Sequence, residues 1–271
     1  MNKENILSKI SKMSEEELID LARSTSDVEI LKILAVNESY EVRCAVAENK
    51  NTLVEMLTAL AQDEDYTVRW FVAFNPNVSV EILTFLAKDE EWRVRCTVAR
   101  SENTPIELLA VLAQDEHRLV REEVALNAST SADMLAMLAK DEDYRVRSAV
   151  AGNINTPIEL LSVLAQDKHW WVRQAVAENK NTPKETLAVL ADDCYLGVRQ
   201  NVAGNKNAPK EALVKLAGDR DYGVRKAVVN NPNTSYNTLL MLSKVKALEI
   251  REKAKEILKE RALKANTNKE R

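Results

Sequence analysis

A Val-Arg dipeptide, Ile-Arg in its last copy, returns every 26 residues along this 271-residue chain. Its arginines are Arg43, Arg69, Arg95, Arg121, Arg147, Arg173, Arg199, Arg225 and Arg251. Aligned on them, nine copies share the pattern T-P-x-E-x-L-x-x-L-A-x-D-x-x-Y-x-V-R-x-x-V-A-x-N-x-N. A fixed period of this length indicates a repeat array, in which each copy buries its apolar face against its neighbours.

Each copy predicts two helices. The first begins at a capping box such as Thr104-Pro105-Ile106-Glu107, with Pro at the first helical position. The same device is predicted at Ser26, Thr52, Thr156 and Thr182. The second helix is short, about Tyr144 to Gly152 in one copy, with Val146 and Val150 as its buried stripe. An Asn follows it in nearly every copy, and we expect this Asn to end the helix in the left-handed conformation.

The two ends of the chain depart from the repeat. Residues 1–25 predict an N-terminal capping helix around Ser14 to Arg23, and residues 26–259 the nine-repeat array. A polar helix is expected from about Leu248 to Ala265, so that residues 260–271 hold its end and a frayed basic tail.

Composition narrows the class of protein. The chain is 45% hydrophobic and 30% charged, with 5 Gly and 6 Pro, which favours an all-α fold. No apolar run approaches the ~20 residues that cross a bilayer, and no secretion signal is expected. Three cysteines without a CxxC pair indicate a cytoplasmic protein. A net charge of −4 argues against nonspecific binding to nucleic acid or acidic membranes.

The elements T-P-x-E-x-L, L-A-x-D and V-R-x-x-V-A-x-N, in that order, resemble the leucine-rich repeat variant family over about residues 26–259. The array is similar, more distantly, to HEAT repeats. The resemblance implies an all-α, right-handed solenoid whose second helix can be partly 3₁₀. Some members carry a cysteine-rich iron–sulfur module before the repeats. This chain has no cysteine before Cys44, so that function does not carry over.

Three repeated columns are interpreted as structural. Seven of the arginines follow an Asp six residues earlier, and such pairs can form within or between repeats as a ladder rather than a phosphate site. The aromatic column is expected to pack against the turn before the second helix; it holds Tyr40, Tyr66, Trp92, Tyr144, Trp170 and Tyr222. A second Asn column, from Asn51 to Asn233, is expected to bridge the loops between helices.

No catalytic set, cofactor site or metal site is predicted. His117 and His169 are two repeats apart, as are Cys44 and Cys96, and helix packing puts such pairs on the order of 20 Å apart. We therefore expect no enzyme.

Candidate binding residues occupy the positions two before, one after and five after the arginine, which point away from the valine stripe. In several copies these positions hold large apolar residues with arginines among them, a composition typical of interaction surfaces. The predicted groove consists of Trp70, Phe74, Arg93, Arg100, Leu119, Leu126, Arg145 and Trp171. In later copies Gly197, Gly204 and Gly223 are expected to leave backbone room for a ligand.

Two functions fit this surface. The first is a non-catalytic scaffold, monomeric or a weak homodimer, that holds a protein or peptide in an apolar and arginine-rich groove. The second is a nucleic-acid-binding protein, remotely related to HEAT-like DNA glycosylases, in which aromatic rings and arginines contact a single strand. The net charge, and Glu122, Glu123 and Glu178 beside the arginines, favour the protein partner.

Overall fold

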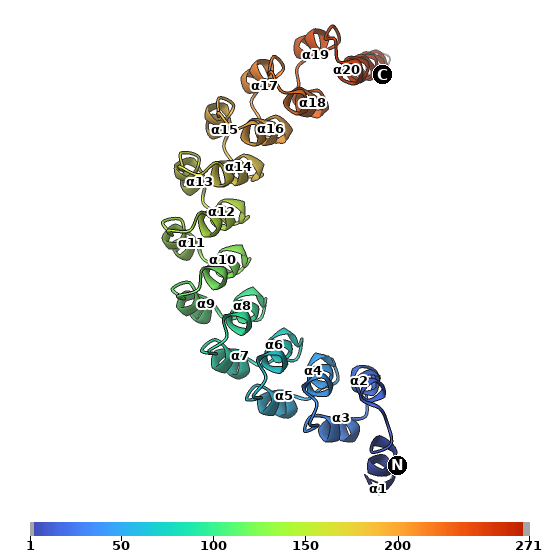
Figure 1. Ribbon diagram of the computed structural model, residues 1–271. Coiled ribbons are helices and arrows are strands. Elements are labelled where there is room, and N and C mark those ends of the chain that lie inside the picture. Colours follow the sequence, from blue (N-terminus) through green and yellow to red (C-terminus); the bar gives the residue numbers. More distant parts are fainter. Residues whose placement is uncertain (1–2, 268–271) are drawn as a thin grey trace. The chain divides into compact units, whose positions relative to one another are not determined.

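The computed structural model describes the backbone of residues 3–267 and the side chains of residues 7–263. All regular structure in that range is helical, with twenty helices and no strand (Figure 1). The chain forms two compact units, Met1–Thr130 and Ser131–Arg271, and each is considered by itself. None of the described helices is both long and apolar enough to cross a membrane.

The helices of the first unit are α1 (Lys3–Ile10), α2 (Glu15–Ser24), α3 (Val28–Leu34), α4 (Tyr40–Glu48), α5 (Val54–Leu60), α6 (Tyr66–Phe74), α7 (Val80–Leu86), α8 (Trp92–Arg100), α9 (Ile106–Leu112) and α10 (Arg118–Leu126). Those of the second unit are α11 (Ala132–Leu138), α12 (Tyr144–Gly152), α13 (Ile158–Leu164), α14 (Trp170–Glu178), α15 (Lys184–Leu190), α16 (Leu196–Gly204), α17 (Lys210–Leu216), α18 (Tyr222–Asn230), α19 (Tyr236–Leu242) and α20 (Leu248–Thr267).

The predicted pair of helices per repeat is confirmed. From α3 to α18 each repeat has a first helix of seven residues and a second helix of nine, and α12 has the predicted bounds. The second helices are α-helical throughout, so the partly 3₁₀ form implied by the resemblance does not occur in them.

The valine stripe and the first-helix leucines form the core. Val68 and Val72 of α6 and Leu57 of α5 are fully buried, and their counterparts repeat this in both units. Within the first unit α4, α6, α8 and α10 pack successively on one another, and within the second α12, α14, α16 and α18 do the same (Figure 1). Because a nine-residue helix is marginal alone, each second helix depends on these neighbours.

The predicted capping boxes at Ser26, Thr52, Thr104, Thr156 and Thr182 are wrong. Pro105, rather than Thr104, is the N-cap of α9, and Asp27 caps α3 in place of Ser26. The Thr52 hydroxyl instead donates a hydrogen bond to the carbonyl of Val46 at 2.6 Å, at the end of the preceding second helix. Thr104, Thr156 and Thr182 repeat this bond. These threonines therefore satisfy carbonyl groups at a helix end instead of amides at a helix start.

The predicted left-handed conformation of the Asn column is also wrong. Asn75 has φ −67° and ψ 134°, and no described residue has a positive φ. Its Nδ2 donates to the carbonyls of Ala47 at 2.6 Å and Asn49 at 3.1 Å in the preceding repeat, and its Oδ1 accepts from the Asn77 amide at 2.8 Å. The same cross-repeat bonds are made by Asn127, Asn179, Asn205 and Asn231.

The second Asn column bridges loops, as predicted. Asn77 Nδ2 donates to the Lys50 carbonyl at 2.6 Å, and Asn207 Nδ2 donates to the Lys180 carbonyl at 2.6 Å. The two Asn columns thus join several of these loops to the preceding repeat.

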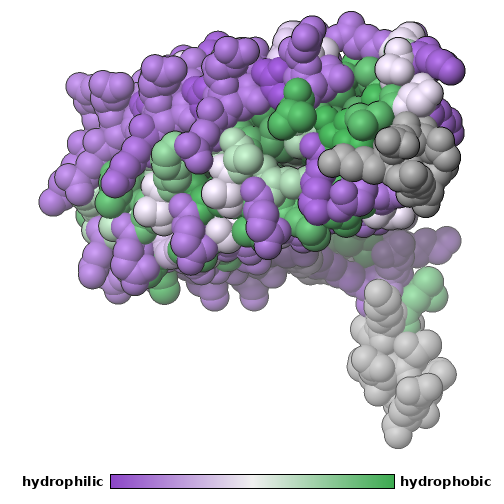
Figure 2. All heavy atoms as spheres, turned by 90° about the horizontal axis from the view of Figure 1, so that it is seen from below, coloured by the Kyte–Doolittle hydropathy of each residue, from purple (hydrophilic) through white to green (hydrophobic). Residues whose placement is uncertain are grey.

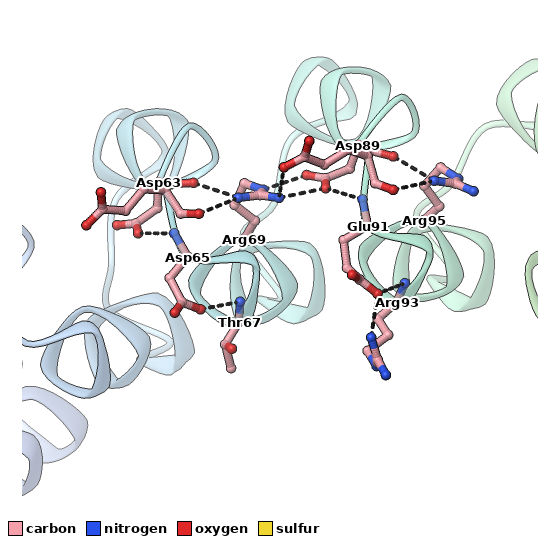
Figure 3. A network of polar contacts seen from close by, with 10 residues as sticks. Asp63, Asp65, Thr67, Arg69, Asp89, Glu91, Arg93 and Arg95 are labelled. Atoms are coloured by element: carbon pink, nitrogen blue, oxygen red, sulfur yellow. Dashed lines mark hydrogen bonds and ion pairs between the residues drawn. The ribbon is translucent and has the colours of Figure 1, made fainter.

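The arginine column forms a ladder between repeats (Figure 3). Arg69 Nε and Nη2 donate to the two carboxylate oxygens of Asp89 at 2.6 and 2.8 Å, twenty residues later in the next repeat. Its Nη1 donates to the carbonyls of Asp63 at 2.8 Å and Glu64 at 3.2 Å, in its own repeat. The same pairing recurs in Arg43–Asp63, Arg95–Asp115, Arg147–Asp167, Arg173–Asp193 and Arg199–Asp219.

The ends differ from the middle. The predicted N-terminal helix is α2, which opens on a capping box at Ser14 and Glu17, and α1 precedes it where no helix was predicted. At the other end α20 continues to Thr267. The tail predicted to fray is residues 266–271; Asn266 and Thr267 belong to α20 instead, and residues 268–271 lie outside the described part of the chain.

Asn179→Ala tests the cross-repeat amide bonds. It removes the donor to the carbonyls of Ala151 at 2.8 Å and Asn153 at 3.0 Å, which lie in a buried position. We expect a loss of about 1–3 kcal/mol in the free energy of unfolding, measured by urea denaturation. Asn181→Ala, which removes an exposed bond to the Ile154 carbonyl, is the matched control and should cost less. Equal losses of unfolding free energy in the two variants would mean that burial of the Asn179 amide does not add to the stability of the protein.

Acid should weaken the ladder. Burial alone would raise the pKa of Asp167, but the hydrogen bonds and charge of Arg147 outweigh it and hold that pKa below its ordinary value of 3.8. A carboxyl with a lowered folded pKa contributes stability above its unfolded pKa and loses it as the pH falls through the folded one. Stability should therefore fall below a pH of about 4.

Asp167→Asn should cost about 3–5 kcal/mol at pH 7, because Arg147 stays buried without its ion pair. The acid dependence of its urea midpoint should be shallower than that of the wild type. Parallel pH profiles for the two proteins would contradict this assignment.

Candidate functional site

The eight predicted groove residues all lie on second helices, but they are divided between the units. Trp70 and Phe74 lie on α6, Arg93 and Arg100 on α8, and Leu119 and Leu126 on α10 of the first unit. Arg145 on α12 and Trp171 on α14 belong to the second unit. We call the exposed side of the second helices in each unit its second-helix face, and the exposed side of the first helices its first-helix face.

In the first unit the predicted apolar residues are partly accessible. Phe74 is 60% exposed and Leu126 is 53% exposed, whereas Trp70 and Leu119 are half-buried. The Trp70 ring stacks on Phe74 with centroids 5.8 Å apart and meets the edge of Phe71 at 4.8 Å. Phe71, which the sequence reasoning missed, makes α6 the centre of an aromatic cluster. The sequence did contain a signal for this cluster, because in the run Trp70-Phe71 a second aromatic residue directly follows a predicted groove residue.

The predicted arginines of the first unit already have partners. Arg100 Nε donates to Glu123 Oε2 at 3.0 Å, and this bond raises the pKa of Arg100. Arg93 Nη1 donates to Glu91 at 2.7 Å, and its guanidinium lies 4.6 Å from the centre of the Trp92 ring. The positive charge of this face is therefore largely balanced within the unit.

In the second unit Trp171 is 49% exposed and stacks on Trp170 with centroids 5.6 Å apart. Arg145 lies over the Tyr144 ring at 4.7 Å and contacts Asp143 at 3.6 Å. The unit thus presents an aromatic group at the N-terminal ends of α12 and α14.

Three rings of the aromatic column pack at a turn before a second helix, and that turn belongs to the next repeat. Each ring stacks on the residue 25 positions later, which is the N-cap of the next second helix. Tyr144 stacks on His169 at 3.7 Å and Trp170 on Tyr195 at 4.1 Å in the second unit. Trp92 stacks on His117 at 4.3 Å in the first. The partners of these rings share one column of the repeat, which holds His117, His169 and Tyr195. The ring-bearing residues of this column were the sequence signal from which the stacks could have been predicted.

The glycines leave less room than predicted. A Cβ on Gly197 would lie 2.6 Å from Gln174 Oε1, and one on Gly223 would lie 3.2 Å from Gln200 Oε1. Glutamine side chains of the preceding repeat therefore cover both. A Cβ on Gly204 would meet nothing within 4 Å, so this glycine does face open space.

Both second-helix faces are hollowed, and none of the eight predicted residues lines the hollow at Gly152 or the one at Tyr40. In the second unit a hollow of about 650 Å³ lies beside Gly152, Ala175 and Glu178. In the first unit one of about 440 Å³ lies between α2, α4 and α6, where Tyr40, Glu41 and Phe71 contribute to its wall. A helical wheel shows which residues are exposed, but a hollow depends on how neighbouring helices are spaced.

The first-helix face also carries exposed apolar residues that were not predicted. Phe85 is 55% exposed and Val111 59% exposed in the first unit, and Val163 and Val189 are each 66% exposed in the second. They share one 26-residue column, which was visible in the sequence. Figure 2 shows apolar side chains gathered between hydrophilic ones on the face that it displays.

The thiols offer no activated nucleophile on the second helices. Cys44 and Cys96 are buried, and burial raises the pKa of each to about 12. Both are therefore protonated at neutral pH and pack as small apolar residues.

Comparisons with known proteins agree with the geometry of the repeat. The family model described as "Leucine rich repeat variant" matches residues 40–65 and 170–193. A solved structure described as "a leucine-rich repeat variant with a novel repetitive protein structural motif" is 29% identical, with a TM-score of 0.62 over 81% of this chain and 87% of that chain. The E. coli protein YibA is 20% identical, with a TM-score of 0.50 over 92% of this chain and 98% of that chain, which is a likeness of fold alone.

No curated protein sequence matches this chain. Each family match covers a second helix, the first helix that follows it and the turn with the ladder aspartate, namely Tyr40 to Asp65 and Trp170 to Asp193. The repeat unit of this chain is therefore similar to that of the leucine-rich repeat variant proteins.

Proposed function

We propose that this chain is a non-catalytic scaffold that holds a protein or peptide partner on the second-helix face. The observation that carries the proposal is a set of exposed apolar side chains on the second helices. The repeated polar residues of these helices already have hydrogen-bond or ion-pair partners inside the array. Phe74 and Leu126 are more than half exposed in the first unit, and Trp171 and Leu196 are each 49% exposed in the second. Large apolar side chains held in water on a rigid framework are typical anchors for a partner.

The framework supports this use. The ladder arginines and aspartates, the Asn columns and the threonines bond to other groups of the array, mostly in neighbouring repeats, so they are committed to structure. The residues left on the second-helix face vary from copy to copy. A partner would therefore be recognised by the face residues of particular repeats, and the array would act as their support.

Nucleic-acid binding is the second candidate. The stacked rings of Trp170, Trp171 and Tyr195 are a specific observation in its favour, because bases stack on exposed aromatic side chains. The arginines argue against it, since each predicted one contacts a carboxylate. These pairs are Arg93–Glu91, Arg100–Glu123 and Arg145–Asp143. A phosphate backbone would have to displace those carboxylates.

Paired surface variants test the proposal. Phe74→Ser with Leu126→Ser alters the second-helix face, and Phe85→Ser with Val111→Ser alters the first-helix face of the same unit at similar exposure. Peptides selected on the wild type from a random library should bind the second-helix variant about tenfold more weakly or worse, because two apolar anchors are lost. They should bind the first-helix variant as they bind the wild type, by fluorescence anisotropy.

Unfolding midpoints close to the wild type would show that both variants are folded. Equal binding by the two variants would contradict the proposed face. A single-stranded oligonucleotide that binds tightly at 50 mM salt and loses affinity steeply by 200 mM would favour the second candidate.

A further inference from the structure

The hollow between α2, α4 and α6 has a lining suited to a cation. Its wall carries three carboxylates, Glu16, Asp20 and Glu41, and two aromatic rings, Tyr40 and Phe71. An aromatic face attracts a cation through its quadrupole, and carboxylates attract it by charge. The combination favours a positively charged ligand over an apolar or anionic one.

The lining arginine does not cancel this charge. Arg23 Nε lies 3.2 Å from Glu48 Oε2, so its own charge is paired on the rim. The Glu41 carboxylate accepts a hydrogen bond from the Ser39 hydroxyl at 2.8 Å, and this bond lowers the pKa of Glu41. Glu41 is therefore ionised at neutral pH, and the hollow carries a net negative charge.

The next repeat shows how a guanidinium sits against this column. Arg93 lies 5.8 Å from the centre of the Tyr66 ring, and its Nη1 donates to Glu91 at 2.7 Å. One repeat earlier, 26 residues back, the ring and carboxylate recur as Tyr40 and Asp65. In place of the arginine stands Thr67, which lines the hollow.

The second unit holds a related contact, in which the arginine lies over the ring next to it in its own repeat, as Arg93 also lies over Trp92 at 4.6 Å. There Arg145 lies over Tyr144 at 4.7 Å and contacts Asp143 at 3.6 Å. The aromatic column thus accepts the chain's own guanidinium in two repeats. At Tyr40 the ring lines the hollow, where the carboxylates are those of Glu16, Asp20 and Glu41.

The rest of the lining suits an arginine side chain. Ile19 and Phe71 are half-buried and can pack against its methylene groups, while the guanidinium stays near the carboxylates. The Cys44 thiol is buried at 7% exposure, and burial together with the charge of Asp65 raises its pKa to about 12. It adds a small neutral surface to the lining.

We propose that this hollow binds the guanidinium of an arginine side chain presented by the partner. The inference rests on the proposed scaffold function, because the hollow adjoins the face assigned to the partner: Phe71 lines it and contacts Trp70 at 4.8 Å. The planar guanidinium can stack on Tyr40 and bond to a carboxylate in its plane, as Arg93 does, whereas an ammonium group cannot stack in this way.

The probe is the capped tripeptide acetyl-Gly-Arg-Gly-amide, titrated into the full chain and followed by the backbone amide NMR signals of Cys44 and Thr67. Saturable shifts at both positions are expected. The citrulline tripeptide, planar but uncharged, should bind at least tenfold more weakly, and the lysine tripeptide several-fold more weakly. Free arginine, tested in parallel, separates a small-molecule site from a peptide site, because the peptide should bind more tightly than the amino acid.

Charge-matched variants make the test specific. Asp20→Asn with Glu41→Gln removes two charges from the hollow and should weaken the tripeptide at least fivefold. Glu64→Gln with Glu90→Gln removes two charges from carboxylates that are 93% and 92% exposed in the same unit, and should change binding less than twofold. All four residues are accessible enough for folding to be preserved, which thermal unfolding verifies.

Three results would overturn the inference: equal weakening by the two variant pairs, equal affinity for citrulline, or shifts confined to residues away from the hollow. The library-selected peptides separate this failure from that of the scaffold. If they bind through Phe74 and Leu126 but are insensitive to the Asp20/Glu41 pair, the scaffold stands and the arginine site falls. If the tripeptide binds the hollow but no selected peptide binds the face, the scaffold falls and the hollow is a site for a small guanidinium compound.

Discussion

Within each unit, most neighbouring repeats are held together by a bidentate ion pair that is nearly removed from water. In the Arg69–Asp89 pair the side chains are 9% and 5% exposed, and the third guanidinium nitrogen is used by carbonyls of the arginine's own repeat. A buried charge is tolerated only when paired and hydrogen-bonded, so the pair permits a single register between neighbouring repeats. The amide bonds of the Asn column also join neighbouring repeats, but they reach back to the preceding repeat.

These contacts decide which residues can meet a partner. The ladder arginines are bound to aspartates, so they are not available as phosphate ligands. The amides and hydroxyls that bond across repeats leave few polar groups of the framework without a hydrogen-bond partner. What varies between copies is confined to the exposed positions of the helices. That separation lets a repeat protein alter its binding surface without altering its fold, since each repeat contacts only its neighbours.

The sequence reasoning succeeded where a property depends on one helix. The 26-residue period, the two helices per repeat and the exposure of Phe74, Leu126 and Trp171 all follow from periodicity within a single element. It failed where a residue bonds to another repeat. The capping role of Thr104 and the left-handed Asn75 were inferred from local rules, but both side chains serve carbonyls at the ends of second helices. The ring stacks, such as Trp170 on Tyr195, were missed for the same reason.

By itself, the sequence determined the helical repeat, its valine and leucine core and the columns that must be structural, because a strict period forces equivalent residues into equivalent environments. Only the tertiary structure decided which partner each column has. It placed Arg93 over Tyr66 and Arg100 against Glu123, and it formed the hollow beside Tyr40. Those outcomes depend on the spacing between neighbouring helices, which is set by packing across repeats and is not encoded in any one of them.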